Sequence, residues 1–238
     1  MSQERLKPPS SRSCGRVAIT VMVVVLASGC GADAPRPVET PNVRWAPGQP
    51  HGDLETDPWV EAVRAAELAH ATAINSANYT DPSMVHSWRA DDVHFFAQRA
   101  ASRLDGGMKY VMLGPAPFTP LAVEEDSSGD AAVVRGCADD MATEPEIEQG
   151  PGPWPQAYVY RLELGPDGHR RVTSSSEVTE PYTLANGDVL TDEYCATVEI
   201  PRGTFDPAPD LEALRKLRGS DVIAPPRPSP TFDVEWPK

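Results

Sequence analysis

The chain has 238 residues, which is enough for one domain of ordinary size with its own hydrophobic core. Its formal net charge is -14 at pH 7, from 35 acidic and 21 basic residues. A chain this acidic repels phosphate backbones and anionic lipid head groups, so its composition argues against a nucleic-acid partner and against electrostatic docking on a membrane.

Residues 1–29 have the layout of a secretory signal peptide. Basic side chains precede a short apolar run, VAITVMVVVLA, and small residues follow it. A helix needs about 20 apolar residues to span a bilayer, so this run is too short to serve as a permanent transmembrane anchor.

The end of the apolar run, LASGC over residues 26–30, resembles the lipobox of bacterial lipoproteins. In that family the cysteine thiolate takes up a diacylglycerol, and a peptidase then cuts the chain before it. The resemblance implies that Cys30 is lipidated and that the rest of the chain lies on the outer face of the cell membrane. Ala27 stands where the family most often has leucine. The alternatives are an ordinary secretory signal and a buried strand with an incidental cysteine.

The excess of arginine over lysine, with abundant alanine, valine and proline, is typical of a GC-rich genome. In this respect the chain also resembles the exported lipoproteins of high-GC Gram-positive bacteria.

The four cysteines divide into two groups. Cys14 lies in the segment to be removed and Cys30 is the expected lipid carrier. Cys137 and Cys195 remain as an even pair in an exported chain, where disulfides persist. Side-chain alternation places both on the more polar face of a sheet, where a bridge would join two strands; two free thiols are the alternative. The chain has no CxxC motif and no Cys/His cluster, so we expect neither a zinc site nor a cofactor.

Residues 30–56 are rich in proline, glycine and polar side chains, which predicts a flexible tether. Order is expected to begin at Asp57, a good N-cap, followed by Pro58 at the first helical position. The alanine-rich run that follows predicts a long helix, whose apolar stripe is Trp59, Val63, Ala66, His70, Ala73 and Ala77.

Two more helices are expected before residue 107. Asp81 and Pro82 begin a short one that runs to about Trp88. Asp91 or Asp92 caps the next, whose apolar residues follow helical spacing until Gly106 and Gly107 end it.

Beyond Gly107 the chain changes to short runs of β-branched and aromatic residues separated by turn signals. These strand-like runs are KYVML, PLAVEE, AAVVRGCA, AYVYRLEL, RRVTSSSEV and EYCATVEI. Helices followed by antiparallel strands predict an α+β fold with the helices packed on one face of the sheet. An acidic, proline-rich loop is expected over 142–155. Residues 204–238 are expected to hold a short helix and a proline-rich end.

The order of elements within residues 57–203 resembles the NTF2-like (cystatin-like) superfamily, in which a curved antiparallel sheet folds around the first helix to form a cone. The resemblance implies a pocket between that helix and the concave face of the sheet. Catalytic members use carboxylates, histidines or tyrosines there for proton transfer, but no family motif maps onto this chain, so we assign no catalytic residue. The residues expected near the pocket are Trp59, His70, Trp88, Phe96, Tyr158 and Tyr160.

The first interpretation of His70 is a hydrogen-bonded core histidine, and proton transfer is the second. The carboxylates over 139–148 lack the spacing of a calcium loop and are expected to be solvated. The sequence therefore predicts a membrane-anchored, extracytoplasmic, non-enzymatic domain that binds a small ligand or an envelope protein. The alternatives are an NTF2-like enzyme acting on a small molecule by proton transfer and a structural accessory of an envelope or secretion complex.

Overall fold

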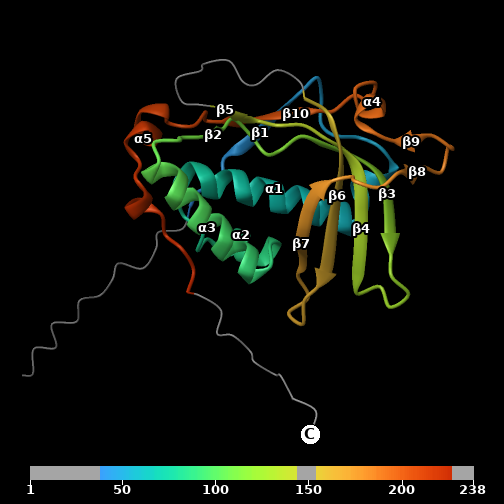
Figure 1. The fold of residues 1–238 in the computed structure, drawn as a ribbon, viewed down its shortest axis with the longest axis horizontal. Helices are drawn as coiled ribbons and strands as arrows, with labels where there is room; N and C mark the ends of the chain where they lie inside the picture. Colours follow the sequence, from blue (N-terminus) through green and yellow to red (C-terminus); the bar gives the residue numbers. More distant parts are fainter. Residues whose placement is uncertain (1–37, 144–153, 227–238) are drawn as a thin grey trace, which may run out of the picture. The chain divides into compact units, whose positions relative to one another are not determined.

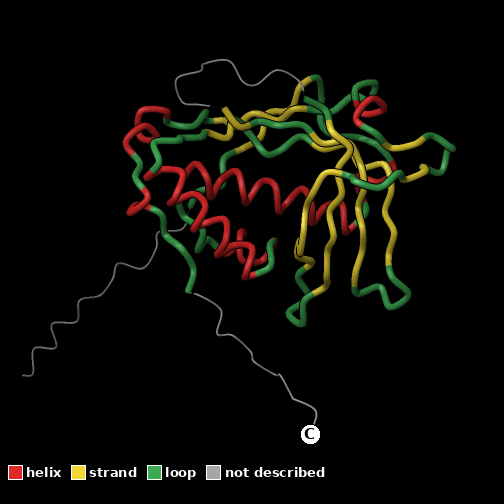
Figure 2. Tube along the Cα trace, in the orientation of Figure 1, coloured by secondary structure: helices red, strands yellow, loops and turns green. Residues whose placement is uncertain are grey.

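The computed structural model describes residues 38–143 and 154–226. The expected signal peptide and Cys30 lie outside these ranges, as do most of the acidic loop and the last residues of the proline-rich end. The described part is a mixed α+β domain in which helices pack against an antiparallel sheet (Figures 1 and 2). No helix within the described ranges is long and apolar enough to cross a membrane.

Five α-helices, two short 3-10 helices and ten strands occur within the described ranges. In chain order they are β1 (Asn42–Ala46), η1 (Asp53–Thr56), α1 (Pro58–Ser76), α2 (Pro82–Ser87), α3 (Ala90–Asp105), β2 (Val111–Met112), β3 (Phe118–Glu125), β4 (Ala131–Ala138), β5 (Ala142–Thr143), β6 (Gln156–Leu164), β7 (Arg170–Glu177), β8 (Tyr182–Thr183), β9 (Val189–Leu190), α4 (Asp192–Cys195), β10 (Arg202–Asp206), α5 (Leu211–Lys216) and η2 (Gly219–Asp221).

The helix starts follow the expected capping chemistry with one exception. Asp57 Oδ1 accepts from the Trp59 backbone N–H at 2.8 Å, and Asp81 Oδ1 accepts from that of Ser83 at 3.0 Å. The prediction for α3 was wrong by two or three residues, because Arg89 is its N-cap. The two expected caps instead lie in the first turn, where their negative charge stabilises the amino-terminal end of the helix.

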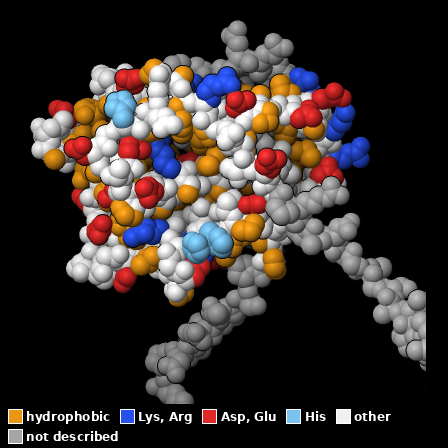
Figure 3. Space-filling view, turned by 180° about the vertical axis from the view of Figure 1, so that it is seen from behind, with side chains coloured by type: hydrophobic (Ala, Val, Ile, Leu, Met, Phe, Trp, Pro, Cys, Tyr) orange, Lys and Arg blue, Asp and Glu red, His pale blue; other side chains and the backbone are white. Residues whose placement is uncertain are grey.

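The main sheet has four antiparallel strands in the order β3-β4-β6-β7. Asp126 organises the turn between the first two, since its Oδ1 accepts from the backbone N–H groups of Asp130 and Ala131. The space-filling view of the molecule from behind shows acidic and basic side chains interspersed with hydrophobic ones (Figure 3). The acidity of the chain is therefore not gathered into one patch on that face.

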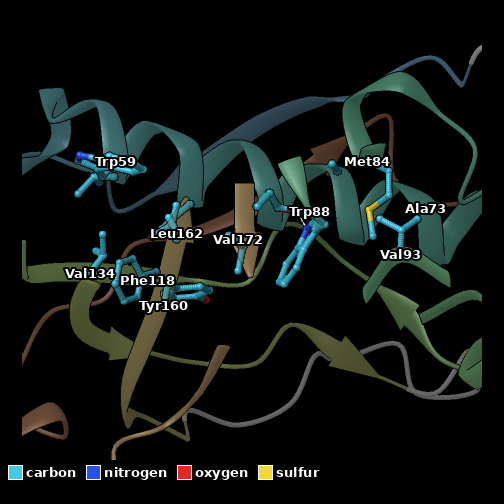
Figure 4. Close-up of a cluster of buried hydrophobic side chains, with 14 of the residues drawn as sticks. Trp59, Ala73, Met84, Trp88, Val93, Phe118, Val134, Tyr160, Leu162 and Val172 are labelled. Carbon is cyan, nitrogen blue, oxygen red and sulfur yellow. Dashed lines mark hydrogen bonds between the residues drawn. The ribbon is translucent and has the colours of Figure 1, made fainter. Parts of the chain in front are cut away.

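The hydrophobic core lies between α1 and the inner face of this sheet. Val134, Leu162 and Val172 each present a buried side chain from a different strand. Trp59 and Val63 meet them from the amino-terminal half of α1, in the cluster drawn in Figure 4. This is the arrangement expected when the apolar stripe of a helix is laid on the apolar face of a sheet.

The ordered domain begins earlier and ends later than predicted. β1 falls inside the expected tether and pairs antiparallel with β10, from Asn42 opposite Asp206 to Ala46 opposite Arg202. Gly203 permits the close approach, because a Cβ at this position would lie 2.4 Å from a Val43 side-chain carbon. The pairing partners are far apart in sequence, so local composition alone gave no sign of this strand.

The predicted disulfide between Cys137 and Cys195 is confirmed, but its predicted surroundings were wrong. The run expected to be a strand forms α4, which Thr191 caps by accepting from the Tyr194 backbone N–H at 3.2 Å. Both cysteines are fully buried in a small apolar cluster with Leu190 rather than lying on a polar sheet face. The bridge therefore joins β4 to a helix.

Candidate functional site

A cleft of about 1120 Å³ lies between α1, α3 and the strands β6 and β7. Its volume is slightly above the range of about 300–1,000 Å³ that is typical of small-molecule sites. Backbone pairing at the α2–α3 junction sets one edge, since the Arg89 N–H donates to Val172 O of β7 at 3.0 Å. The lining includes Glu67, His70, Ile74, Trp88, Arg89, Asp92, Phe96, Arg99, Arg103, Asp139, Asp140, Tyr158, Tyr160, Thr173, Ser174 and Ser175.

The structure brings five of the six expected pocket residues into this one lining: His70, Trp88, Phe96, Tyr158 and Tyr160. Trp59 is not among them. It is 1% exposed in the core, and the Arg170 guanidinium lies over its ring at 4.8 Å from the centroid. In the view of Figure 4, Leu162 and Val172 lie between Trp59 and Trp88.

Three rings from α1, the α2–α3 junction and α3 form the aromatic wall of the cleft. The His70 ring stacks on Phe96 at 4.5 Å and meets Trp88 edge-on at 5.7 Å. Phe96 and Trp88 are perpendicular at 5.0 Å. The indole N–H of Trp88 donates to Ala66 O at 2.9 Å, so the tryptophan is held by a buried hydrogen bond as well as by packing.

A buried carboxyl group lies in the same lining, three residues before His70 on α1. Glu67 is 8% exposed, and its Oε1 accepts from the Tyr160 hydroxyl at 2.9 Å. The Tyr160 ring is itself fixed by edge-on contact with Phe118 at 5.0 Å. The hydrogen-bonded carboxyl and phenol groups are therefore held in place in the cleft wall, where helix α1 faces strand β6.

Glu67 and His70 both favour their neutral forms. Burial raises the pKa of Glu67 to about 7, with Asp140 adding to the effect, while the Tyr160 hydrogen bond and Arg64 oppose it. Burial lowers the pKa of His70 to about 4, and the positive charges of Arg103 and Arg99 lower it further. At neutral pH the imidazole is uncharged and the carboxyl group can exchange a proton.

The sheet side of the cleft is polar. Tyr158 shares a hydrogen bond with Ser175, and burial is the main reason that its pKa is raised. Thr173 and Ser174 line the cleft from β7, the strand that also carries Ser175. The run RRVTSSSEV, which was expected to be a strand, does form β7. Together with the aromatic wall, this side gives the cleft apolar surface and hydroxyl groups facing one another.

Asp139 closes the end of the cleft near β4. Its Oδ2 forms an ion pair with Arg202, and its Oδ1 accepts from the Trp154 backbone N–H at 2.8 Å. Across residues 38–143 and 154–226, no group of three or more His, Cys, Asp or Glu side chains could hold a metal ion. The groups available for chemistry in the described cleft are carboxyl and guanidinium groups, an imidazole, phenols and hydroxyls.

Glu67 is the site residue that the sequence reasoning missed. It lies four residues after Val63 and three before His70, both of which belong to the predicted apolar stripe. A carboxylate at that spacing is on the buried face of the helix, where it needs a polar partner. Its position on the stripe was thus the available signal.

The fold and the cleft define an α+β domain with an open, mixed aromatic and polar site. No family model and no curated protein matches the chain. Among solved structures, the intermembrane space region of the chloroplast protein ARC6 is similar with a TM-score of 0.35 and 14% identity, over 55% of this chain and 100% of that one. A similarity this low identifies neither a fold family nor a function.

Proposed function

We propose that this chain is an exported lipoprotein, anchored in the cell membrane through Cys30, whose domain binds a small ligand in the cleft between α1, α3 and the sheet. The carrying observation is the cleft itself: about 1120 Å³, with an aromatic wall facing hydroxyl groups. Sites that bind small molecules combine apolar walls with a few fixed polar groups in this way. The position of the cleft between the first long helix and the sheet supports the NTF2-like cone.

The binding proposal is tested by a ligand screen, followed by substitution of a residue that lines the cleft. Thermal unfolding of the mature protein is measured against a panel of small aromatic and polyhydroxylated compounds, and compounds that raise the melting temperature are titrated. Tyr158→Ala, which enlarges the cleft and removes a hydroxyl, is expected to weaken their binding at least tenfold. Tyr182→Ala is the matched control, because Tyr182 lies outside the cleft and its hydroxyl donates to Glu124. Equal weakening in both variants would contradict the cleft as the site.

The anchoring proposal is tested separately. Metabolic labelling with a fatty-acid precursor is expected to mark the wild-type protein, and Cys30→Ala is expected to lose both the label and the membrane association. Label retained by Cys30→Ala would show that the attachment is elsewhere.

A second candidate function is proton transfer on the bound molecule, and the Glu67–Tyr160 contact is the observation that favours it. A carboxyl group whose pKa is near neutrality can act as a general base or acid at physiological pH. A ligand found in the screen is therefore incubated in deuterated water, and exchange at its carbon-bound hydrogens is followed by NMR. Exchange that disappears in Glu67→Gln supports an enzyme, whereas binding without any exchange supports a binding protein.

A further inference from the structure

A second hollow opens beside the cleft, between α1, α3, the chain that follows α3, and α5. We call it the α3–α5 pocket. It has a volume of about 120 Å³ and apolar walls that include Ile74, Leu104, Leu214 and Leu217. An apolar cavity of about 150 Å³ is known to hold one benzene molecule, so this pocket takes a ring or a short alkyl chain rather than a whole lipid.

The charged residues of this pocket all have one sign. Arg99, Arg103 and Lys109 line it, and no Asp or Glu is among the lining residues that the structure describes. None of the three forms a salt bridge with another described residue. In a chain of net charge -14, three cations that pair with no described acidic side chain around one apolar hollow are a local reversal of the overall charge.

The mouth of the pocket is amphipathic. Met108 is 53% exposed and Tyr110 is 39% exposed, which leaves large apolar side chains in contact with water at the lining. The Arg103 guanidinium lies 5.0 Å from the centroid of the Tyr110 ring, and this cation–π contact holds the charge at the mouth. Arg99 and Arg103 also help to lower the pKa of His70, whose ring lines the same pocket, so both guanidinium groups act on its interior.

We propose that the α3–α5 pocket binds a small anionic amphiphile: a carboxylate or phosphate ester carried on a short alkyl or aryl group. The apolar part lies against Ile74, Leu104 and Leu214, and the anion pairs with Arg99 and Arg103 at the mouth. Burial of the apolar group provides affinity, and the charge-assisted hydrogen bonds to guanidinium select an anion over a neutral or cationic analogue. This inference does not depend on the cleft being a ligand site.

Isothermal titration calorimetry with four six-carbon probes and inorganic phosphate tests the ligand class. Hexanoate and hexyl phosphate are expected to bind, while hexan-1-ol and hexyltrimethylammonium bind at least about tenfold more weakly. Hexyl phosphate that binds while inorganic phosphate does not shows that the apolar part is required. Binding of hexan-1-ol as tight as that of hexanoate, or no binding of either anion at millimolar concentration, overturns the proposal.

Variants test the charge requirement and the location of the site. Arg99 and Arg103 also line the cleft, so Ala100→Phe, at a residue that lines the α3–α5 pocket alone, is the variant that locates it. The double variant Arg99→Gln/Arg103→Gln is expected to weaken hexanoate binding about tenfold to a hundredfold. Ala100→Phe, which fills the pocket from α3, is expected to weaken it similarly without removing charge. Arg161→Gln is the matched control, because Arg161 is an exposed arginine on β6 that lines none of the pockets described.

Circular dichroism verifies that each variant is folded. Unchanged hexanoate affinity in a folded double variant overturns the assignment. Retained affinity in Tyr158→Ala distinguishes this site from the cleft, because Tyr158 lines the cleft and not the α3–α5 pocket. The two proposals can therefore fail independently.

Discussion

The two halves of α1 belong to the same helix but face different surroundings. In the first half, Trp59 and Val63 are at most 1% exposed and pack against the apolar face of the sheet. In the second half, Glu67, His70 and Ile74 line the cleft or the pocket beside it. A regular helix thus contributes to core stability at one end and to a site at the other, according to what lies opposite. Variants at the two ends are therefore expected to separate stability from binding.

The largest effect is expected in the first half of α1, which packs in the core. Trp59→Ala leaves a large cavity in the core and removes the surface over which Arg170 lies, so it should lower the free energy of unfolding by about 3–5 kcal/mol. Urea unfolding followed by circular dichroism measures this change. Trp154→Ala is the control, because Trp154 is 69% exposed and should change stability by about 0.5 kcal/mol or less. A loss below about 1 kcal/mol in Trp59→Ala would mean that this half of α1 is not part of the stabilising core.

The next effect is a pH dependence of stability that comes from the second half of α1, which lines the cleft. The pKa of Glu67 is about 7 in the folded protein against 4.5 for the ordinary group, so the folded state retains a proton that the unfolded state releases. Stability is therefore fully present below about pH 4.5 and falls by about 3 kcal/mol as the pH rises through about 7. Glu67→Gln, which keeps an oxygen to accept from Tyr160, should remove this fall.

Urea unfolding at several pH values between 4.5 and 8 checks that prediction. Glu163→Gln, a change at an exposed carboxyl group of β6, should leave the wild-type curve in place. If the free energy of unfolding depends on pH in the same way in Glu67→Gln and in the wild type, Glu67 does not retain its proton in the folded state.

His70 should give a slope of the opposite sign and somewhat smaller size. Its pKa is about 4 when folded and 6.5 ordinarily, so the unfolded state takes up a proton that the folded state excludes. Stability is present above about pH 6.5 and is lost as the pH falls towards 4, by about 2 kcal/mol for this half-buried group. His70→Gln should remove that loss, and His51→Gln, at an exposed histidine, should not.

Because the two slopes oppose each other between about pH 4.5 and 6.5, the wild type should be nearly flat there. Each single variant should then reveal the slope of the other residue. Parallel curves for both single variants would show that the two groups do not titrate as described.

The smallest effect is expected at the start of the helix. Asp57→Ala removes the cap that accepts from the Trp59 backbone N–H, and it should cost about 1 kcal/mol of stability. The cap precedes the half of α1 that packs in the core, so ligand binding at the half that lines the cleft should be unchanged within error. A change in affinity without a change in stability would contradict the separation of the two halves.

The helices α1, α2, α3 and α5 and the four long strands follow from local patterns, and these were predicted. Asp57 and Asp81 are caps recognisable from the residues that follow them, and the alternation around Tyr160 and Leu162 marks a half-buried strand. Local signals of this kind need only a few neighbouring residues. They also placed most of the cleft's aromatic residues on the correct elements.

What could not be predicted depended on distant partners. Nothing near Asn42 indicates that β10 will pair with it, and the composition of the run around Cys195 favours a strand although Thr191 supplies a helix cap. Glu67 was missed because a carboxylate is ordinarily expected in solvent. Its burial becomes interpretable when Tyr160, 93 residues later, supplies the hydrogen bond.

The pairing of β1 with β10 has a mechanical consequence if the proposed anchor exists. Residues 31–41 would then be all that separates the lipid from the first strand, a reach of at most about 40 Å. Tension from the membrane would reach the domain first at Val38, whose backbone N–H donates to Asp81 Oδ2 at 3.2 Å, and next at the ladder between the two strands. Val43 and Phe205 of that ladder share a hydrophobic cluster with Ala71 of α1, so a load on the ladder would reach the helix that carries the candidate site.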